Sequence, residues 1–113
     1  MFKVTFYKTA DGRKPASEFI RSLDDVARQQ IVHELRNLES MGNLLNEEKS
    51  KHLEDGLFEL RIKDRTNAYR MIYFFVVGEL IIVTNGFAKK TQKTPKREIE
   101  LAKQYRADYL ARQ

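Results

Sequence analysis

The sequence predicts an α+β fold with the element order β-α-α-β-β-β-α. We expect a curled antiparallel sheet, a meander of three strands plus an N-terminal strand, with an N-terminal helical hairpin and a C-terminal helix. Apolar residues alternate with polar ones near the N-terminus and again after residue 57, as in strands. Between residues 24 and 41 and after residue 95 they recur every three or four positions, as in helices. The length of 113 residues fits a single domain, 1–113.

A strand and two helices are expected in the N-terminal half. Residues 2–7 alternate as a half-buried strand does. Pro15 suits the first turn of a short helix, because its missing N–H costs nothing there. Asp24 suits the start of a second helix, and Gly42 its end. The apolar stripe of that helix consists of Ala27, Ile31, Leu35 and Leu38. Residues 43–55 are expected to form a polar loop.

Three strands follow. Residues 58–63 alternate, Tyr69–Val77 is a long apolar run, and Leu80–Val83 returns after a two-residue turn at Gly78 and Glu79. Short connections predict an antiparallel meander. The nearly continuous apolar runs predict that both faces of the middle strands are covered.

The last helix is expected after a loop at residues 88–94. Thr94 is its candidate N-cap and Pro95 its first helical residue. The helix should run to about residue 112 and pack through one side, made of Ile99, Ala102, Tyr105 and Tyr109.

The positive charge is concentrated in the last quarter of the chain. Residues 1–86 carry 13 Lys and Arg against 13 Asp and Glu, whereas residues 87–113 carry 8 against 3. This asymmetry indicates an anionic partner, either a nucleic acid or an acidic protein. A solvated basic helix without any partner is the alternative.

Several classes of protein are disfavoured. The chain has no cysteine, no apolar run long enough for a membrane span and no signal-peptide pattern at its start, so we expect a cytoplasmic protein without a membrane partner. The two histidines, His33 and His52, make a zinc site improbable, and no metal or cofactor is expected. His33 is expected at the surface or boundary of its helix.

A cluster of cations is predicted on the sheet. Arg61 and Lys63 share one face of a strand, and Arg70 lies on the neighbouring strand across a short turn. Lys89 and Lys90 follow the last strand and should reach the same end of the sheet. Such a cluster suits phosphate, because guanidinium forks bind it well. Alternatively, these residues serve solubility, and Arg61 pairs with Glu59 or Glu79.

Three further side chains are candidates for a catalytic or ligand-binding role. His52 precedes the first strand of the meander, and histidine is the residue type whose unperturbed pKa lies near neutrality, as a catalytic base requires. Tyr69 and Tyr73 either offer stacking surfaces and hydroxyls to a ligand or belong to the core.

Four segments of the chain resemble the RelE/ParE toxin superfamily, and within it the HigB-type, phage-derived Gp49-like proteins. The segments are LFELRIK at 57–63, YRMIYF at 69–74, GFAKKTQKTP at 86–95 and EIELA at 98–102. The expected order of elements agrees with a RelE-like fold. The segment at 86–95 is the most specific of the four.

The resemblance implies the toxin of a type II toxin–antitoxin system, a metal-independent endoribonuclease that cuts mRNA on the ribosome. The implied partners are a HigA-type helix-turn-helix antitoxin, the ribosome and mRNA, with operator DNA bound only through the antitoxin complex. ParE-type relatives inhibit DNA gyrase instead, so a gyrase inhibitor is one alternative. An inactive relative that only binds the antitoxin is another.

The resemblance also implies roles for single residues. Arg61 and Lys63 match basic strand positions that contact RNA, and Arg70 matches the residue that binds the scissile phosphate. Arg70 and one of Lys89 and Lys90 would stabilise the transition state. His52 is the candidate base, with Lys63 as its alternative, and Tyr73 a candidate RNA contact.

One catalytic residue of the family has no counterpart here. RelE-like members carry a tyrosine at the approach to the last helix, but residues 91–99 contain none. The next tyrosine, Tyr105, is expected on the packing side of the helix. The identity of the acid and base therefore stays open.

Overall fold

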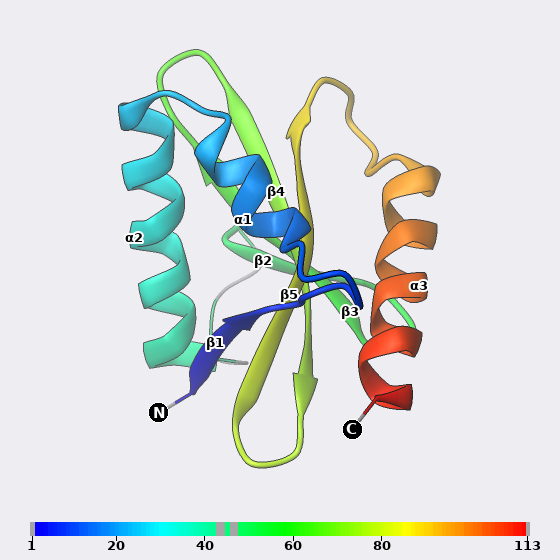
Figure 1. The fold of residues 1–113 in the computed structure, drawn as a ribbon. Helices are drawn as coiled ribbons and strands as arrows, with labels where there is room; N and C mark the ends of the chain where they lie inside the picture. The colour runs from blue at the N-terminus through cyan, green and yellow to red at the C-terminus, as the bar shows by residue number, and fades with distance from the viewer. Residues whose placement is uncertain (1, 43–44, 46–47, 113) are drawn as a thin grey trace.

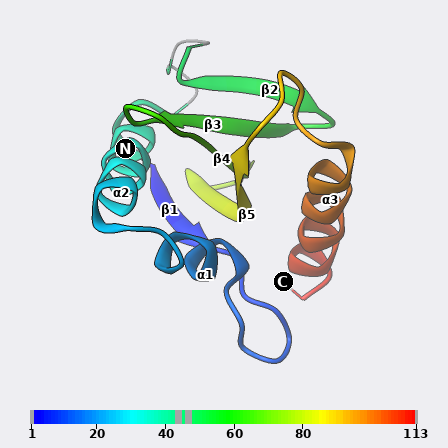
Figure 2. The same ribbon diagram turned by 90° about the horizontal axis from the view of Figure 1, so that it is seen from above.

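A five-stranded sheet separates two helices on one face from a third helix on the other (Figures 1 and 2). The computed structural model describes residues 2–42, 45 and 48–112. The elements are β1 Lys3–Phe6, α1 Pro15–Arg21, α2 Asp25–Met41, β2 Ser50–Glu54, β3 Leu57–Lys63, β4 Ala68–Val76, β5 Leu80–Lys89 and α3 Lys96–Ala111. The strand order is β1-β5-β4-β3-β2. Strands β2 to β5 form an antiparallel meander, and β1 is parallel to β5. The predicted fold class is confirmed.

The N-terminal helices begin and end where the sequence predicts. Pro15 opens α1, and the Asp24 carboxylate caps α2 by accepting the N–H of Ala27 at 2.9 Å. Gly42 ends α2 with a φ of +54°, and a Cβ there would lie 2.0 Å from the ring of Phe2. A side chain is therefore excluded both by the backbone and by the packing of β1 against α2.

The prediction of a polar loop over residues 43–55 was wrong for Ser50–Glu54, which form β2. Residues 43–44 and 46–47 lie outside the described residues. As the last strand at its edge of the sheet, β2 is mostly exposed, so its sequence lacks the apolar alternation that marks the other strands.

The turn between β4 and β5 contains three residues, Val77 to Glu79, and not the predicted two. Val77 is 99% exposed at its tip, and both Gly78 and Glu79 have a positive φ. Strand β5 also runs further than expected, to Lys89. The strand continues past a bulge at Thr84, whose hydroxyl donates to the carbonyl of Ile72 at 3.1 Å.

Two apolar clusters cover the two faces of the sheet, as predicted. On the face covered by α1 and α2, here the hairpin face, Leu60, Met71 and Tyr73 pack against the buried stripe of α2. On the opposite face, here the α3 face, Ile72 and Phe74 pack against α3. The α2 stripe consists of Ala27, Ile31, Leu35 and Leu38.

The start of α3 differs from the prediction by one residue. Pro95 is the N-cap, and the helix begins at Lys96. The hydroxyl of Thr94, expected to cap the helix, donates instead to the Glu59 carboxylate at 2.5 Å. A carboxylate is a stronger acceptor partner for a hydroxyl, so Thr94 ties the approach to α3 to the sheet.

Part of the positive charge of the last quarter holds α3 in place. Lys103 forms ion pairs with Glu54 and Asp55 in the β2–β3 turn. Near the C-terminus, Arg112 pairs with Asp108 at 2.6 Å. These cations have partners within the chain, so the charge excess is in part structural. No helix of the described part of the chain is long and apolar enough to cross a membrane.

Candidate functional site

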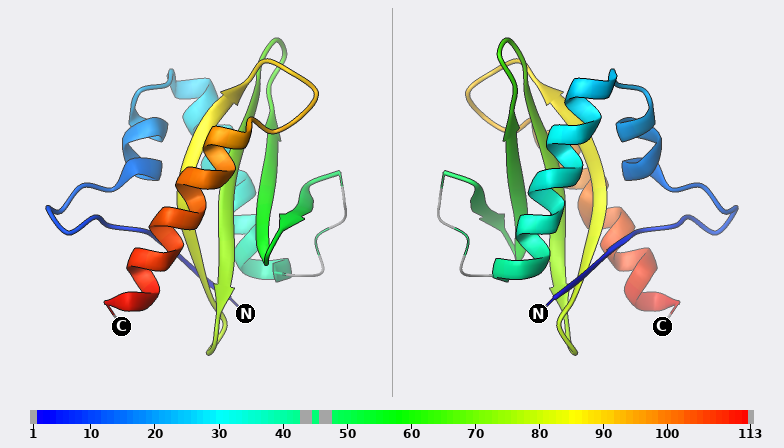
Figure 3. Two further views of the ribbon diagram at one scale, coloured as in Figure 1. Left: turned by 90° about the vertical axis from the view of Figure 1, so that its right-hand side faces the viewer. Right: turned by 90° about the vertical axis from the view of Figure 1, so that its left-hand side faces the viewer.

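The β3–β4 turn and the β5–α3 connection lie at the same end of the sheet (Figure 3). In the β3–β4 ladder Arg61 is directly opposite Arg70, and Lys63 is opposite Ala68, which on its other side pairs with Lys89. Arg70 alternates with Ile72 and Phe74 along β4, so these cations lie on the α3 face. Helix α3 covers Ile72 and Phe74 but not this end of the sheet.

Two adjoining depressions form what we call the basic groove. One, of about 550 Å³, lies where β3 extends beyond β2, and its lining includes Glu34 and Glu48 as well as Lys49 and Arg61. The second, of about 420 Å³, lies between β4 and the residues after β5. They share Lys63, Ala68 and Arg70. The second is lined by Lys63, Ala68, Arg70, Lys89, Lys90, Thr91 and Gln92, and none of these described residues is acidic. The sequence-predicted cations thus meet in one concave surface.

Arg70 is the most buried of these cations, with 8% of its surface exposed. Its Nη1 donates to the carbonyl of Tyr69 at 3.0 Å, but its buried Nε has no hydrogen-bond partner among the described residues. Burial lowers the pKa of Arg70, although a guanidinium keeps its charge at any physiological pH. A largely buried cation beside a depression whose described lining holds no acid is suited to bind an anion.

Glu59 supports the two arginines from within the sheet. It is 2% exposed, its Oε2 accepts from Arg61 Nε at 3.1 Å, and the same oxygen lies 3.7 Å from Arg70 Nε. Its other oxygen accepts from Thr94. One carboxylate between two facing guanidiniums offsets their repulsion only in part, so the groove keeps a net positive charge.

Lys89 has a lowered pKa. Burial is the main cause, and the positive charge of Arg70 adds to it, as do Arg61 and Lys51, against an opposing effect of Glu59. An ammonium with a lowered pKa gives up its proton more readily than an ordinary lysine. Lys89 is therefore our candidate proton donor in the groove.

We expect Lys89 to titrate below the ordinary lysine value of 10.5, and Arg70→Ala to raise its pKa toward that value. Without the neighbouring guanidinium, the ammonium is less repelled and keeps its proton to higher pH. NMR titration of the Lys89 side chain measures both effects. Arg36→Ala, on the exposed side of α2, removes the same charge far from the groove and should leave the value unchanged. A Lys89 pKa at the ordinary lysine value, unchanged by Arg70→Ala, would contradict this explanation.

The structure does not bring His52 and Tyr73 to the groove. Both face Phe58 across their ladders, so they lie on the hairpin face of the sheet. The His52 ring contacts the Phe58 ring edge-on, and its Nε2 accepts the N–H of Gly56 at 3.2 Å. Tyr73 is 1% exposed and stacks on Phe58, with its hydroxyl bonded to Ser50.

The other tyrosines belong to the core. Tyr69 is 5% exposed, and its ring meets Phe19 edge-on. Tyr105 stacks on Tyr7 with 4.7 Å between the ring centres, on the packing side of α3 as predicted, and Tyr109 packs against Phe74. Among the described residues, no group of three or more His, Cys, Asp or Glu side chains is arranged to hold a metal ion. His33 is exposed on α2.

The sequence named Glu59 only as an alternative partner of Arg61, a pairing that the structure confirms, and it gave no site role to Lys51 or Thr94. Glu59 shares its strand face with Arg61 and Lys63 by simple alternation, so its position was readable, but its burial and its role between two arginines were not. Lys51 lies opposite Glu59 on β2, a strand that the sequence did not reveal. The contact of Thr94 joins residues 35 positions apart, which no local pattern reports.

Comparison with known proteins gives one family match. The model of the family described as "Phage derived protein Gp49-like (DUF891)" matches residues 18–107, a range that includes every residue of the basic groove. A search of the curated proteins finds no match.

Proposed function

Because the chain belongs to the phage-derived Gp49-like family, a family of RelE/HigB-like toxins, we propose that it is a toxin that cleaves mRNA on the ribosome. The observation that carries the proposal is the largely buried guanidinium of Arg70, which lines a groove together with further cations. An RNA strand supplies the phosphates that such a groove would bind, and electrostatic attraction of this kind supports binding without any metal.

The proposed reaction is attack by a ribose 2′-oxygen on the neighbouring phosphorus. The O2′–P bond forms and the P–O5′ bond breaks, which leaves a 2′,3′-cyclic phosphate and a 5′-hydroxyl. A base takes the proton of the 2′-hydroxyl, an acid protonates the leaving O5′, and cations stabilise the additional charge on the phosphorus oxygens.

The geometry favours particular residues for these roles. Arg70 would bind the scissile phosphate and, with Lys90, stabilise the charged transition state, while Arg61 would contact a neighbouring phosphate. Lys89 would protonate the leaving oxygen, because its pKa is lowered. Of the two bases predicted from the sequence, Lys63 lines the groove and His52 lies on the opposite face. Lys63 would therefore be the base, a role that it can take only as the neutral amine.

Primer extension on a reporter mRNA tests the proposal. We expect cells that produce the wild-type protein to show cuts within the translated region, and these cuts should disappear when the start codon of the reporter is removed. Fragments should end in a cyclic phosphate. Growth arrest without mRNA cuts, accompanied by DNA damage signalling, would contradict the ribonuclease and point to a ParE-like action on gyrase.

An antitoxin is the second part of the proposal. Toxins of this kind are paired with a small antitoxin, and for the HigB type we expect a helix-turn-helix protein that binds operator DNA. In the described part of this chain the groove is open to solvent. The antitoxin would therefore act either by covering the groove or by preventing the toxin from reaching the ribosome.

A further inference from the structure

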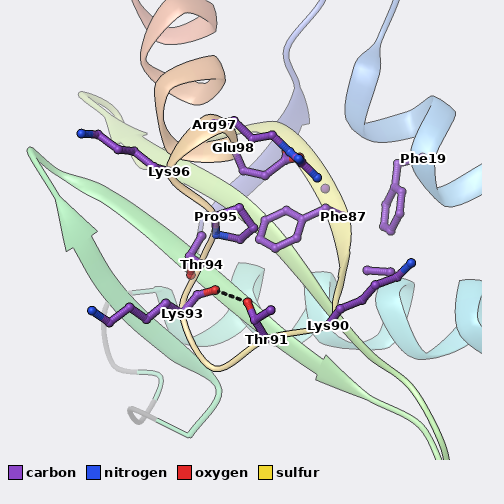
Figure 4. A pocket seen from close by; sticks show the side chains of 12 residues that line it. Phe19, Phe87, Lys90, Thr91, Lys93, Thr94, Pro95, Lys96, Arg97 and Glu98 are labelled. Carbon is purple, nitrogen blue, oxygen red and sulfur yellow. Dashed lines mark hydrogen bonds and ion pairs between the residues drawn. The ribbon is translucent and has the colours of Figure 1, made fainter.

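Next to the basic groove lies a larger cavity of about 810 Å³, here the aromatic cavity. It opens along the part of β5 that extends beyond its pairing with β1. Figure 4 shows Phe87 and Pro95 on one side of it and Phe19, from α1, on the other. Its volume is within the range of about 300–1,000 Å³ of small-molecule sites. Its full lining is Phe19, Gly86, Phe87, Ala88, Lys90, Thr91 and residues 93–98.

Gly86 gives Phe19 its position. A Cβ at Gly86 would lie 2.7 Å from the Phe19 ring and 2.4 Å from the sulfur of Met71. Without a side chain there, the ring lies against the strand and forms one wall of the cavity. A flat aromatic wall opposite an apolar one is suited to a planar ligand.

The cavity continues the basic groove. Lys90 and Thr91 line both the cavity and the adjoining depression that holds Arg70 and Lys89. A ligand whose phosphate lies at Arg70 can therefore extend past Lys90 into the cavity without leaving the surface. The cavity rim carries more cations than acids, since Lys90, Lys93, Lys96 and Arg97 accompany only Glu98.

Glu98 offsets only part of the charge of this rim. Its carboxylate accepts from the side-chain amide of Asn85 at 3.1 Å and lies 3.8 Å from Arg97 Nε. Both contacts use the carboxylate within the chain, so the lysines of the rim are left to attract an anionic ligand.

We propose that the aromatic cavity binds a nucleobase of single-stranded RNA, the base next to the phosphate held at Arg70, against the ring of Phe19. This inference rests on the proposed function and adds a base-binding subsite to it. An acidic peptide would also be attracted by the rim lysines, but it needs neither an aromatic wall nor continuity with a phosphate site. A nucleotide uses both features.

Binding of short RNA by fluorescence anisotropy tests the subsite. The probes are a seven-nucleotide RNA with 2′-deoxyribose in place of each ribose that could be cleaved, and a set in which each position in turn lacks its base. With the wild type, one missing base should weaken binding by about tenfold, because stacking on an aromatic ring is lost. With Phe19→Leu, binding of the complete RNA should weaken equally, and the missing base should no longer matter.

Phe19→Tyr retains an aromatic ring and should again bind the complete RNA more tightly than the RNA that lacks the base. This variant distinguishes a loss of stacking from a loss of packing. Arg36→Ala is the matched surface control, and circular dichroism checks that each variant is folded. If no missing base weakens wild-type binding, or if Phe19→Leu keeps the discrimination, the subsite is wrong. A hexaglutamate peptide that displaces RNA from the wild type but does not bind Phe19→Leu would also overturn it.

Failure of the subsite and failure of the proposed function give different results. Loss of RNA binding in Arg70→Ala together with mRNA cuts by the wild type supports the function whatever Phe19→Leu does. RNA binding that is insensitive to Arg70→Ala would instead remove the phosphate site on which both proposals depend.

Discussion

Replacing Arg70 with alanine should lower the rate of mRNA cleavage by about 100- to 1,000-fold, since removing one group that stabilises transition-state charge has an effect of this size. The guanidinium is 8% exposed and lines the groove, so its interaction with a phosphate would be largely shielded from water and would be strong. Arg70→Lys keeps the charge but loses the planar fork, and should retain only part of the activity. The readout is the initial rate of primer-extension products in a translating extract.

The fold should survive this substitution. Arg70 contributes one hydrogen bond, from Nη1 to the Tyr69 carbonyl, and an ion pair of 3.7 Å with Glu59. Glu59 keeps its contacts with Arg61 and Thr94 when Arg70 is removed. Arg36→Ala supplies the matched loss of one positive charge and should cleave at the wild-type rate. Arg70→Ala that is folded and cleaves like the wild type would eliminate the assigned phosphate site.

Replacing Glu59 with alanine should mainly reduce stability, whereas Arg70→Ala should mainly reduce activity. Arg61 and Arg70 would then face each other in the ladder with no carboxylate between them. Removing one partner from a buried ion pair costs about 3–5 kcal/mol, because the remaining charge is left uncompensated away from water. We expect the free energy of unfolding, measured with urea, to fall by about 3 kcal/mol.

Two controls show whether this loss is electrostatic. Glu100→Ala removes an acid from the exposed side of α3, where the nearest cation, Lys103, is 3.9 Å away, and should change stability by less than about 0.5 kcal/mol. Added phosphate should stabilise Glu59→Ala more than the wild type, because an anion bound by the two arginines replaces the missing charge in the folded state only. A variant as stable as the wild type would mean that Glu59 has no supporting role.

These two substitutions separate the contribution of Glu59 to stability from the contribution of Arg70 to cleavage. The carboxylate of Glu59 allows two like charges to be placed opposite each other, and Arg70 uses that placement at the groove. The arrangement leaves the cations incompletely neutralised, which is a cost to stability that an anionic ligand would relieve.

Local periodicity predicted much of this molecule. The alternation in β3 and β4 placed Arg61, Lys63 and Arg70 on one face, and the short turn between the strands brought them together, as the register later showed. The stripe of α2, its aspartate cap and its terminal glycine were also correct. Each of these features depends on residues a few positions apart, so it can be read from the chain directly.

Long-range pairing decided the rest. β2 is a polar strand defined only by its partner β3, and its register turned His52 away from the cations and Lys51 toward them. Alternation likewise put Tyr73 on the face opposite Arg70, but only the packing of Phe58 against it showed that it is buried. The aromatic cavity brings α1 together with β5 and the start of α3, which lie more than sixty residues further along the chain. The sequence alone thus determined the elements other than β2 and the identity of the basic cluster. The tertiary structure decided which faces meet, because a side chain's surroundings depend on the strands and helices placed around it.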